Sequence, residues 1–251
     1  MDFYSYLLLD IALRRLKCVR NVDAPQDIKP MCRLRWNKNV LEKNDLQADE
    51  NREHFQEHGI LAINLMSSPG AGKTSLLEKT AELLTDLRLG VIEGDLETSR
   101  DAERIRAKGV PAVQITTGSA CHLDAFMVHH GLHELPLEEL DVVFIENVGN
   151  LVCPASYDVG AHLNVVLLSV VEGDDKPEKY PVMFRKAHLM VITKTDMLPY
   201  TDFSVERAVK SARKVNPSID VIKLSVKTGE GLEDWAEYIR FKVGAFRKSL
   251  V

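Results

Sequence analysis

A glycine-rich loop between an apolar stretch and a helix-like stretch carries the clearest chemical signal of the chain. It reads Ser67-Ser68-Pro69-Gly70-Ala71-Gly72-Lys73-Thr74, directly after the apolar run that ends at Met66. Glycines let a loop curl with its N–H groups inward, and a following helix adds the positive end of its dipole, so the pattern suits a chain of phosphates. The lysine reaches the β and γ phosphates, and the hydroxyl after it ligates Mg²⁺. We predict that a nucleoside triphosphate is bound by Ser68, Gly70, Ala71, Gly72, Lys73, Thr74 and Ser75.

Two later segments indicate that the base is guanine. Thr193-Lys194-Thr195-Asp196 follows an apolar run, and a carboxylate at Asp196 accepts both N1–H and N2–H of guanine. Adenine offers no such pair of donors, so the wrong base leaves the carboxylate unsatisfied. The last apolar run leads into Ser225-Val226-Lys227-Thr228-Gly229, which resembles the second guanine-contacting loop of GTPases. We predict GTP and GDP as ligands of Lys194, Asp196, Ser225, Val226 and Lys227.

Two acidic residues follow apolar runs and are candidates for holding Mg²⁺ or the attacking water. Asp95 ends the run before Glu93-Gly94-Asp95, and Glu146 ends Val142-Val143-Phe144-Ile145. Magnesium prefers hard oxygen ligands, so we expect Thr74, Asp95 and Glu146 to surround it. The predicted catalytic set is Lys73, Asp95 and Glu146. The alternative is that one acid caps a turn, and no arginine is singled out as a transition-state ligand, although Arg100 and Arg104 are candidates.

Two cysteines and a histidine indicate a second site for a softer metal. Cys121 and His122 are adjacent, and Cys153 follows the Glu146 segment. Thiolate and imidazole are ligands of Zn²⁺ and Ni²⁺, although free cysteines are more often buried packing residues. Three ligands are one too few for a closed tetrahedral site, and a symmetric dimer would supply the rest. His129 and His133 have i,i+4 spacing, which we interpret as exposed residues at a helix end.

The elements that position these residues alternate along the chain from Ile60 onward. Most candidate strands are continuous apolar runs, which are typical of strands covered on both faces. We predict strands over 60–66, 90–94, 110–116, 141–146, 163–171, 188–193 and 219–224, and helices near 73–88, 98–107, 122–133, 204–215 and 230–244. This order predicts an α/β fold of the P-loop NTPase type, with a mostly parallel sheet and helices on both faces.

The region before Ile60 divides into two parts. Residues 1–37 show no clear periodicity and contain Pro25 and Pro30, so we expect a poorly specified extension. Residues 38–58 are highly charged with a narrow apolar stripe, which predicts a surface helix leading into the main domain. The expected domain boundaries are therefore 1–37 for the extension and 38–251 for the nucleotide-binding domain.

Bulk properties exclude several classes of partner. The 251 residues carry a net charge of −5, which disfavours nucleic acid as a main partner. No apolar run is long enough to span a bilayer, and the first residues lack the pattern of a secretory leader. Four cysteines are too few for a disulfide scaffold in a chain of this length, so we expect a reducing cytoplasm and no membrane association.

Taken together, these segments resemble the HypB-type hydrogenase nickel-incorporation GTPases, within the SIMIBI class. The resemblance covers about residues 39 to 244 and is most specific in two segments. The segments that carry it are Ser67–Thr74, Glu93-Gly94-Asp95, Thr117-Gly118 with Cys121-His122-Leu123-Asp124-Ala125, Glu146-Asn147-Val148-Gly149-Asn150-Leu151-Val152-Cys153-Pro154, Val40-Leu41-Glu42-Lys43-Asn44-Asp45 and Glu50-Asn51-Arg52.

The resemblance implies a slow GTPase that acts as a metallochaperone in the maturation of [NiFe]-hydrogenase. It implies that GTP favours a homodimer and that Cys121, His122 and Cys153 hold Ni²⁺ or Zn²⁺ at the dimer interface. It also implies that hydrolysis is linked to transfer of the metal to a nickel metallochaperone and the hydrogenase large subunit.

Two residues depart from the general GTPase pattern, and several alternatives stay open. Ser67 replaces a glycine, and Thr193 replaces the usual asparagine, which weakens the expected guanine selection. Isolated Cys18 and Cys32 do not form the cysteine-rich N-terminal nickel motif of many members.

Three alternative functions stay open. They are a GTPase chaperone for another metalloenzyme, of the urease-accessory or cobalamin-enzyme type, a small-molecule kinase that uses ATP, and a nickel store.

Overall fold

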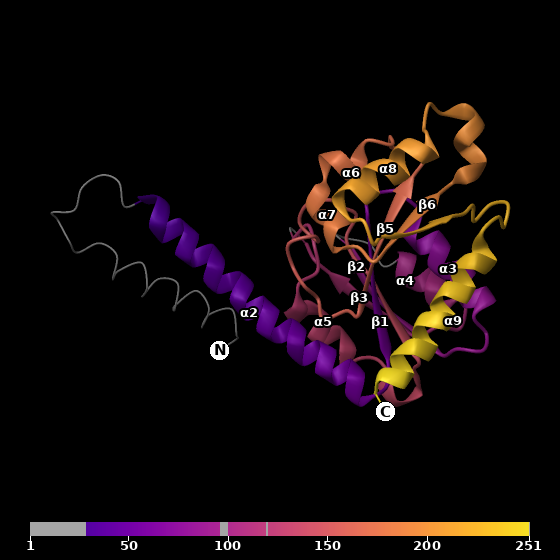
Figure 1. Cartoon of the computed structure of the whole chain (residues 1–251). Coiled ribbons are helices and arrows are strands. Elements are labelled where there is room, and N and C mark those ends of the chain that lie inside the picture. The colour runs from indigo at the N-terminus through magenta and orange to yellow at the C-terminus, as the bar shows by residue number, and fades with distance from the viewer. Residues whose placement is uncertain (1–28, 96–99, 119, 251) are drawn as a thin grey trace, which may run out of the picture. The chain divides into compact units, whose positions relative to one another are not determined.

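A seven-stranded parallel sheet forms the centre of the chain. The computed structural model describes residues 29–95, 100–118 and 120–250 (Figure 1). The chain separates into two compact units, Met1–Glu42 and Lys43–Val251, and the second unit contains the sheet. The first 28 residues, including Cys18, lie outside the described residues, so the expected extension 1–37 stays a prediction.

The strands occur where the apolar runs predict them. They are β1 (Leu61–Ser67), β2 (Leu89–Asp95), β3 (Ala112–Thr116), β4 (Val142–Glu146), β5 (Leu163–Ser169), β6 (Leu189–Thr193) and β7 (Asp220–Lys223). Their order across the sheet is β3-β2-β4-β1-β5-β6-β7, and every neighbouring pair is parallel. The carboxyl ends of all strands therefore meet at one edge, which confirms the predicted α/β architecture.

The helices match the predicted ones with additions. They are α2 (Lys29–Glu57), α3 (Lys73–Leu83), α4 (Arg100–Arg106), α5 (Ala125–Leu132), α6 (Lys176–Lys179), α7 (Pro181–Lys186), α8 (Val205–Val215) and α9 (Leu232–Ser249), with short 3₁₀ segments η2 (Leu137–Glu139) and η3 (Thr195–Tyr200). Helix α2 begins at Lys29, upstream of the expected start at 38, because Pro30 lies in the first turn, where no backbone N–H is needed. In the described part of the chain, no helix is both long enough and apolar enough to cross a bilayer.

Alternate residues of β1 bury themselves on opposite faces of the sheet. Leu61, Ile63 and Leu65 belong to the core that includes residues of α3 and α9. Met66 belongs to the core on the other face, which includes residues of α7 and α8. This alternation follows from the two-residue period of a strand, and burial on both faces explains why β1 is mostly apolar.

The C-terminal half of α2 is fixed by two buried asparagines. The Asn44 side chain accepts a hydrogen bond from the Ala125 N–H at 2.9 Å and donates to the Asp158 carbonyl at 2.8 Å. The Asn51 amide donates to the carbonyls of Ala125, at 2.8 Å, and Val159, at 3.2 Å. Because a buried amide is costly without partners, these four contacts fix the helix against the start of α5 and against the loop at 158–159.

Candidate functional site

The glycine-rich loop follows β1 and opens α3, as predicted. Gly70 and Gly72 have φ values of 73° and 100°, in the left-handed region that favours glycine. The buried Lys73 side chain lies over the loop, and its amine donates to the Ser67 hydroxyl at 3.1 Å. Ser67, the departure from the general pattern, therefore provides a hydrogen-bond acceptor for this lysine. Burial lowers the pKa of Lys73, and the acidic groups around it oppose that shift.

The Thr74 hydroxyl lies between two carboxylates. It is 2.9 Å from Glu146 Oε1 and 3.1 Å from Asp101 Oδ2, so its single proton is donated to one of them at a time. Glu146 was predicted from its place at the end of β4, whereas Asp101 on α4 was missed because an acid in a helical segment carries no distinctive signal. Asp95 ends β2, at the same edge of the sheet.

Two glutamates beside the loop are buried. Burial raises the pKa of Glu146 to about 7 and that of Glu93, in the middle of β2, to about 8. Among the described residues, Oε2 of each has no hydrogen-bond partner. Unpaired buried carboxylate oxygens next to a threonine hydroxyl form the hard oxygen set that Mg²⁺ requires, so the site fits this ion. Sequence reasoning missed Glu93 because it lies inside an apolar strand.

The two arginine candidates lie on α4. Arg104 forms ion pairs with Glu78, at 2.5 Å, and with Asp101, at 2.9 Å. The Glu78 contact joins α4 to α3, and Asp101 in turn contacts the Thr74 hydroxyl. Arg100 is an exposed residue at the start of α4. The Arg104 guanidinium is thus already paired with two carboxylates.

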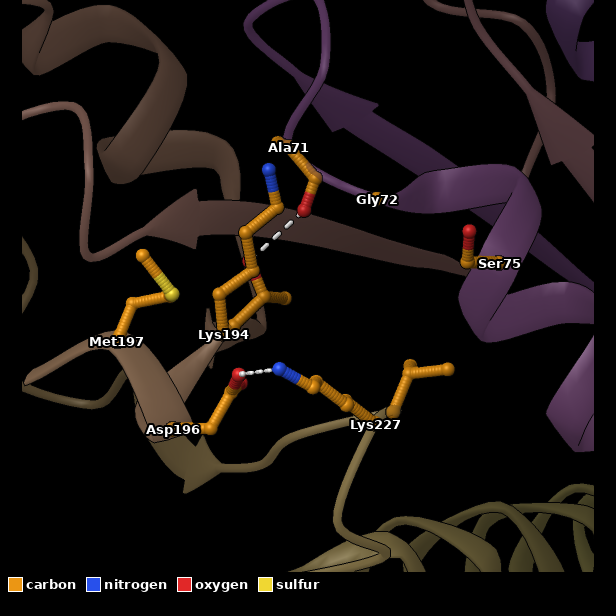
Figure 2. A pocket seen from close by; sticks show the side chains of 9 residues that line it. Ala71, Gly72, Ser75, Lys194, Asp196, Met197 and Lys227 are labelled. Atoms are coloured by element: carbon orange, nitrogen blue, oxygen red, sulfur yellow. Dashed lines mark hydrogen bonds and ion pairs between the residues drawn. The ribbon is translucent and has the colours of Figure 1, made fainter.

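A pocket of about 350 Å³ opens beside the P-loop (Figure 2). It is lined by Ala71, Gly72, Ser75, Thr193, Lys194, Asp196, Met197, Val226 and Lys227. The Thr193 hydroxyl donates to the Ala71 carbonyl at 2.8 Å, and the Lys194 amine donates to the Gly70 carbonyl at 2.7 Å. Thr193 thus joins this loop to the P-loop even though it replaces the usual asparagine. Met197 was missed, since nothing in the sequence distinguishes it from a core methionine.

Asp196 is held at the mouth of this pocket by residues of the last predicted loop. The Ser225 hydroxyl donates to Asp196 Oδ1 at 2.7 Å, and the Lys227 amine lies 3.9 Å from Asp196 Oδ2. Figure 2 shows Asp196 and Lys227 facing each other across the pocket. The Ser225 hydroxyl also accepts from the Thr228 N–H at 3.2 Å, within its own loop. The contacts of Ser225 and Lys227 with Asp196 join the two segments predicted to contact a base.

The cysteines and the histidine predicted to bind metal also come together. The ligand atoms of Cys121, His122 and Cys153 all lie within 4.8 Å of one another. The two sulfurs are 2.8 Å apart as free thiols, and Cys121 Sγ is 3.8 Å from His122 Nδ1. The hydrogen bond with Cys153 raises the pKa of the Cys121 thiol, so an arriving cation must displace a proton. The His122 ring stacks on Tyr157 with ring centres 3.9 Å apart, a contact that the sequence did not reveal.

A buried amide connects the loop of Cys121 to the end of β4. Asn147 Oδ1 accepts hydrogen bonds from the backbone N–H groups of Leu123 and Val148, both at 3.0 Å. The Asn147 Nδ2 donates to Asn64 Oδ1 on β1 at 3.3 Å. Asn147 directly follows Glu146, so the thiol loop and the carboxylate beside the P-loop share one rigid strand end.

The fold and the phosphate loop define a nucleotide-binding protein of the P-loop NTPase class. Residues 61–223 match the family described as CobW/HypB/UreG, nucleotide-binding domain. The chain is 55% identical over 212 residues to the hydrogenase maturation factor HypB of Azotobacter vinelandii, covering 84% of this chain and 70% of that protein. The chain belongs to the HypB family of hydrogenase maturation factors.

Two further relatives agree with this assignment. The hydrogenase/urease maturation factor HypB of Helicobacter hepaticus is 49% identical over 207 residues, with 81% of this chain and 85% of that protein covered. The crystal structure of HypB from Helicobacter pylori in complex with nickel matches with a TM-score of 0.79 and 46% identity, covering 81% of this chain and 96% of that one. These similarities confirm the resemblance that the sequence indicated.

Proposed function

We propose that this protein hydrolyses GTP slowly and uses the GTP cycle to deliver nickel during assembly of [NiFe]-hydrogenase. The observation that carries the proposal is the adjacency of two sites along one segment. Glu146, beside the P-loop, and Cys153, in the thiol cluster, belong to the strand end and loop that follow β4. A nucleotide that repositions this strand end would also reposition a metal ligand.

In this proposal, the residues beside the P-loop bind and orient the triphosphate. The Gly70–Gly72 backbone and Lys73 hold the phosphates, and Asp196 with the Ser225–Lys227 loop selects guanine. Thr74, Glu146 and Asp95 would hold Mg²⁺, with Asp101 nearby, and the bound ion would supply positive charge against the phosphate oxygens. Glu146, whose pKa lies near 7, is suited to hold the attacking water.

The nickel is cargo, held by Cys121, His122 and Cys153 at the interface of a homodimer. Three protein ligands leave a tetrahedral ion one ligand short, and a twofold axis through the site brings a second set. Two apolar side chains next to the cluster support an interface there, since Val152 is 58% exposed and Phe126 is 44% exposed. Large exposed apolar side chains around a polar centre are typical of association surfaces.

The partners in this proposal are a nickel metallochaperone and the hydrogenase large subunit, in the cytoplasm. A second client class is favoured by one observation, because the H. hepaticus relative is a hydrogenase/urease maturation factor. Urease and hydrogenase both require nickel, so the same site would serve either. Deleting the gene and measuring both activities with and without added nickel distinguishes the two clients.

Nickel binding with and without a non-hydrolysable GTP analogue tests the proposal. We expect the analogue to raise bound Ni²⁺ by about one ion per two chains, and to double the mass in solution. The same measurement with an ATP analogue provides the matched control and should change neither quantity. A GTP-loaded protein that stays monomeric, or that binds nickel equally well without nucleotide, would refute the shared-ion model.

A further inference from the structure

Four histidines gather where the C-terminal end of α2 lies beside the C-terminal end of α5. His54 is in the last turn of α2 and His58 directly follows that helix, while His129 is in α5 and His133 is its C-cap residue. Ring centres are separated by 5.1 Å for His54–His58, 5.6 Å for His54–His133 and 4.6 Å for His129–His133. The sequence interpretation of His129 and His133 as helix-end residues did not include the α2 pair, which is distant in the chain.

The hydrogen bonds around His129 fix which ring nitrogen carries its proton. The Asn51 amide nitrogen donates to two backbone carbonyls, so its oxygen is the acceptor for His129 Nδ1 at 3.1 Å. His129 Nδ1 therefore bears the hydrogen, and the lone pair of the neutral ring is on Nε2. That Nε2 points at His133 Nε2, 3.2 Å away.

His58 is oriented in the same way by a carboxylate. Its Nδ1 lies 3.2 Å from Glu138 Oε1, and a carboxylate oxygen can only accept, so the Nδ1 carries the proton and Nε2 the lone pair. A histidine that donates its other ring N–H to a carboxylate or amide oxygen is the usual arrangement of metal-binding imidazoles, because the contact fixes the ring and raises its basicity. Two of the four rings already have such a contact.

The separations within each histidine pair fit imidazoles that share one ion. With nitrogen at about 2.0–2.1 Å from a metal, two ligand nitrogens lie about 2.9–3.4 Å apart and their ring centres about 4.5–5.3 Å apart at angles of 90–110°. The Nε2–Nε2 distance of 3.2 Å and the ring separations of 4.6 Å and 5.1 Å fall in these ranges. Between the two pairs the ring centres are farther apart, at 5.6 Å for His54–His133 and 6.5 Å for His54–His129, so the rings must rotate toward one another before all four hold one ion.

We propose that His54, His58, His129 and His133 form a second metal site, an all-imidazole site for a divalent transition-metal ion such as Ni²⁺. It is separate in residues and chemistry from the thiol cluster, and its binding requires neither nucleotide nor a second copy of the chain. Imidazole nitrogen favours Ni²⁺, Cu²⁺ and Zn²⁺ over Mg²⁺. His54 and His129 are half-buried and His133 is exposed, so an ion has access from solvent.

The charges around the cluster are compatible with a cation. Burial lowers the pKa of both His54 and His129, and repulsion between the imidazolium forms lowers it further. Glu57 faces His54 and Glu50 faces His129 with negative charge. Neutral imidazole is the form that binds metal, and nearby carboxylates attract the cation without occupying its ligand positions.

Nickel binding to a full-length chain with all four cysteines replaced by serine tests this site. Removing the thiols disables the Cys121–His122–Cys153 cluster, so a failure of that cluster's proposed role does not affect the result. With Ni²⁺ as the probe in equilibrium dialysis, without nucleotide, we expect about one ion per chain. In the same background, His54→Asn with His133→Asn should weaken binding roughly tenfold or more, since even loss of a group that supports a ligand costs about that much.

His130→Asn is the matched control, because His130 is an exposed histidine on the same helix outside the proposed set. Its nickel affinity should equal that of the cysteine-free parent. NMR provides a second test that does not depend on the nickel-binding measurement. Addition of Zn²⁺ should shift the signal of His129 Nε2 while Nδ1 stays protonated. The site does not exist if the cysteine-free chain takes up no nickel, or if the double histidine variant binds it as well as the control.

Discussion

Gly149 lies so close to Pro69 that a Cβ on Gly149 would be 2.8 Å from the Pro69 Cα. Pro69 is part of the phosphate loop, and Gly149 is in the loop that ends in Cys153. Backbone contacts of this kind transmit displacement, because neither partner has a flexible side-chain end that can move aside. The phosphate loop and the thiol loop therefore touch directly, without an intervening element.

Adding one methyl group at this contact should disturb both loops. For Gly149→Ala we expect a stability loss of about 1–3 kcal/mol from overpacking and weaker binding of a GTP analogue. Thermal unfolding and nucleotide titration measure the two effects. Gly244→Ala is the matched control, since no atom lies within 4 Å of its added Cβ and alanine favours a helix interior. Equal behaviour of the two variants would show that the contact is not tight in solution.

Replacing the P-loop lysine should abolish turnover without unfolding the protein. Lys73→Ala removes the amine that donates to the Ser67 hydroxyl and, with it, the loop's own positive charge for the phosphates. We expect GTP hydrolysis to fall by roughly a thousandfold or more, because positioned positive charge is the main contribution to phosphoryl transfer. Phosphate release measures the loss. Lys79→Ala, on the same helix but paired with Glu82 at the surface, should hydrolyse GTP normally.

Changing the base-contacting carboxylate should remove the preference for guanine. Asp196→Asn keeps an oxygen for the Ser225 hydroxyl but replaces the acceptor for one guanine N–H with a donor. Affinity for GDP should fall by roughly 10–100-fold, the cost of one or two unsatisfied polar groups. Affinity for xanthosine diphosphate, which has a carbonyl in place of the 2-amino group of guanine, should fall less. A wild-type protein that prefers ADP would contradict the assignment of this pocket to guanine.

Removing one sulfur should separate metal binding from nucleotide binding. Cys153→Ala deletes a ligand 2.8 Å from Cys121 Sγ and leaves every contact of Thr74 and Asp196 in place. We expect the nucleotide-dependent uptake of Ni²⁺ to disappear while GTP affinity changes by less than about twofold. Cys32→Ala provides a control at a cysteine that is not among the proposed ligands. Should Cys153→Ala take up nickel like the wild type, the cluster is not the binding site.

The buried glutamate on β2 should make the nucleotide-free protein less stable at high pH. The folded state holds a proton on Glu93 up to about pH 8, whereas the unfolded chain loses it near 4.5. Between these values the folded state binds more protons, so the free energy of unfolding falls as pH rises. Glu93→Gln should flatten this decline by about 1–3 kcal/mol. Denaturant unfolding from mildly acidic to alkaline pH measures it, and parallel curves for variant and wild type would contradict the pKa assignment.

The sequence predicted most of the sheet because its strands are covered on both faces. A run such as Val142-Val143-Phe144-Ile145 is apolar at every position, and only a doubly buried strand requires that. Two short helices, α6 and α7, were missed because Pro177 and Pro181 punctuate a stretch too short to show periodicity. The same residue type misled the prediction for α2, where Pro30 begins the helix rather than interrupting it.

Site residues that belong to a sequence motif could be predicted. Site residues that come together only when distant segments pack against one another could not. Lys73, Thr74 and Asp196 belong to motifs that fix their surroundings. Asp101 and Glu93 have no motif, and their role depends on how α4 and β2 approach the P-loop. The four histidines between α2 and α5 likewise become a group only after two distant segments pack together.

Asn44 and Asn51, which fix α2 in place, make this helix part of the folded nucleotide-binding domain. A fragment starting at β1 would retain every nucleotide-contacting residue yet leave the Ala125 N–H and carbonyl without their amide partners. Since Ala125 opens the helix that directly follows Cys121 and His122, such trimming would loosen the thiol loop before it affected the triphosphate. Helix α2, which precedes the first strand, therefore supports the loop that contains the proposed metal ligands Cys121 and His122.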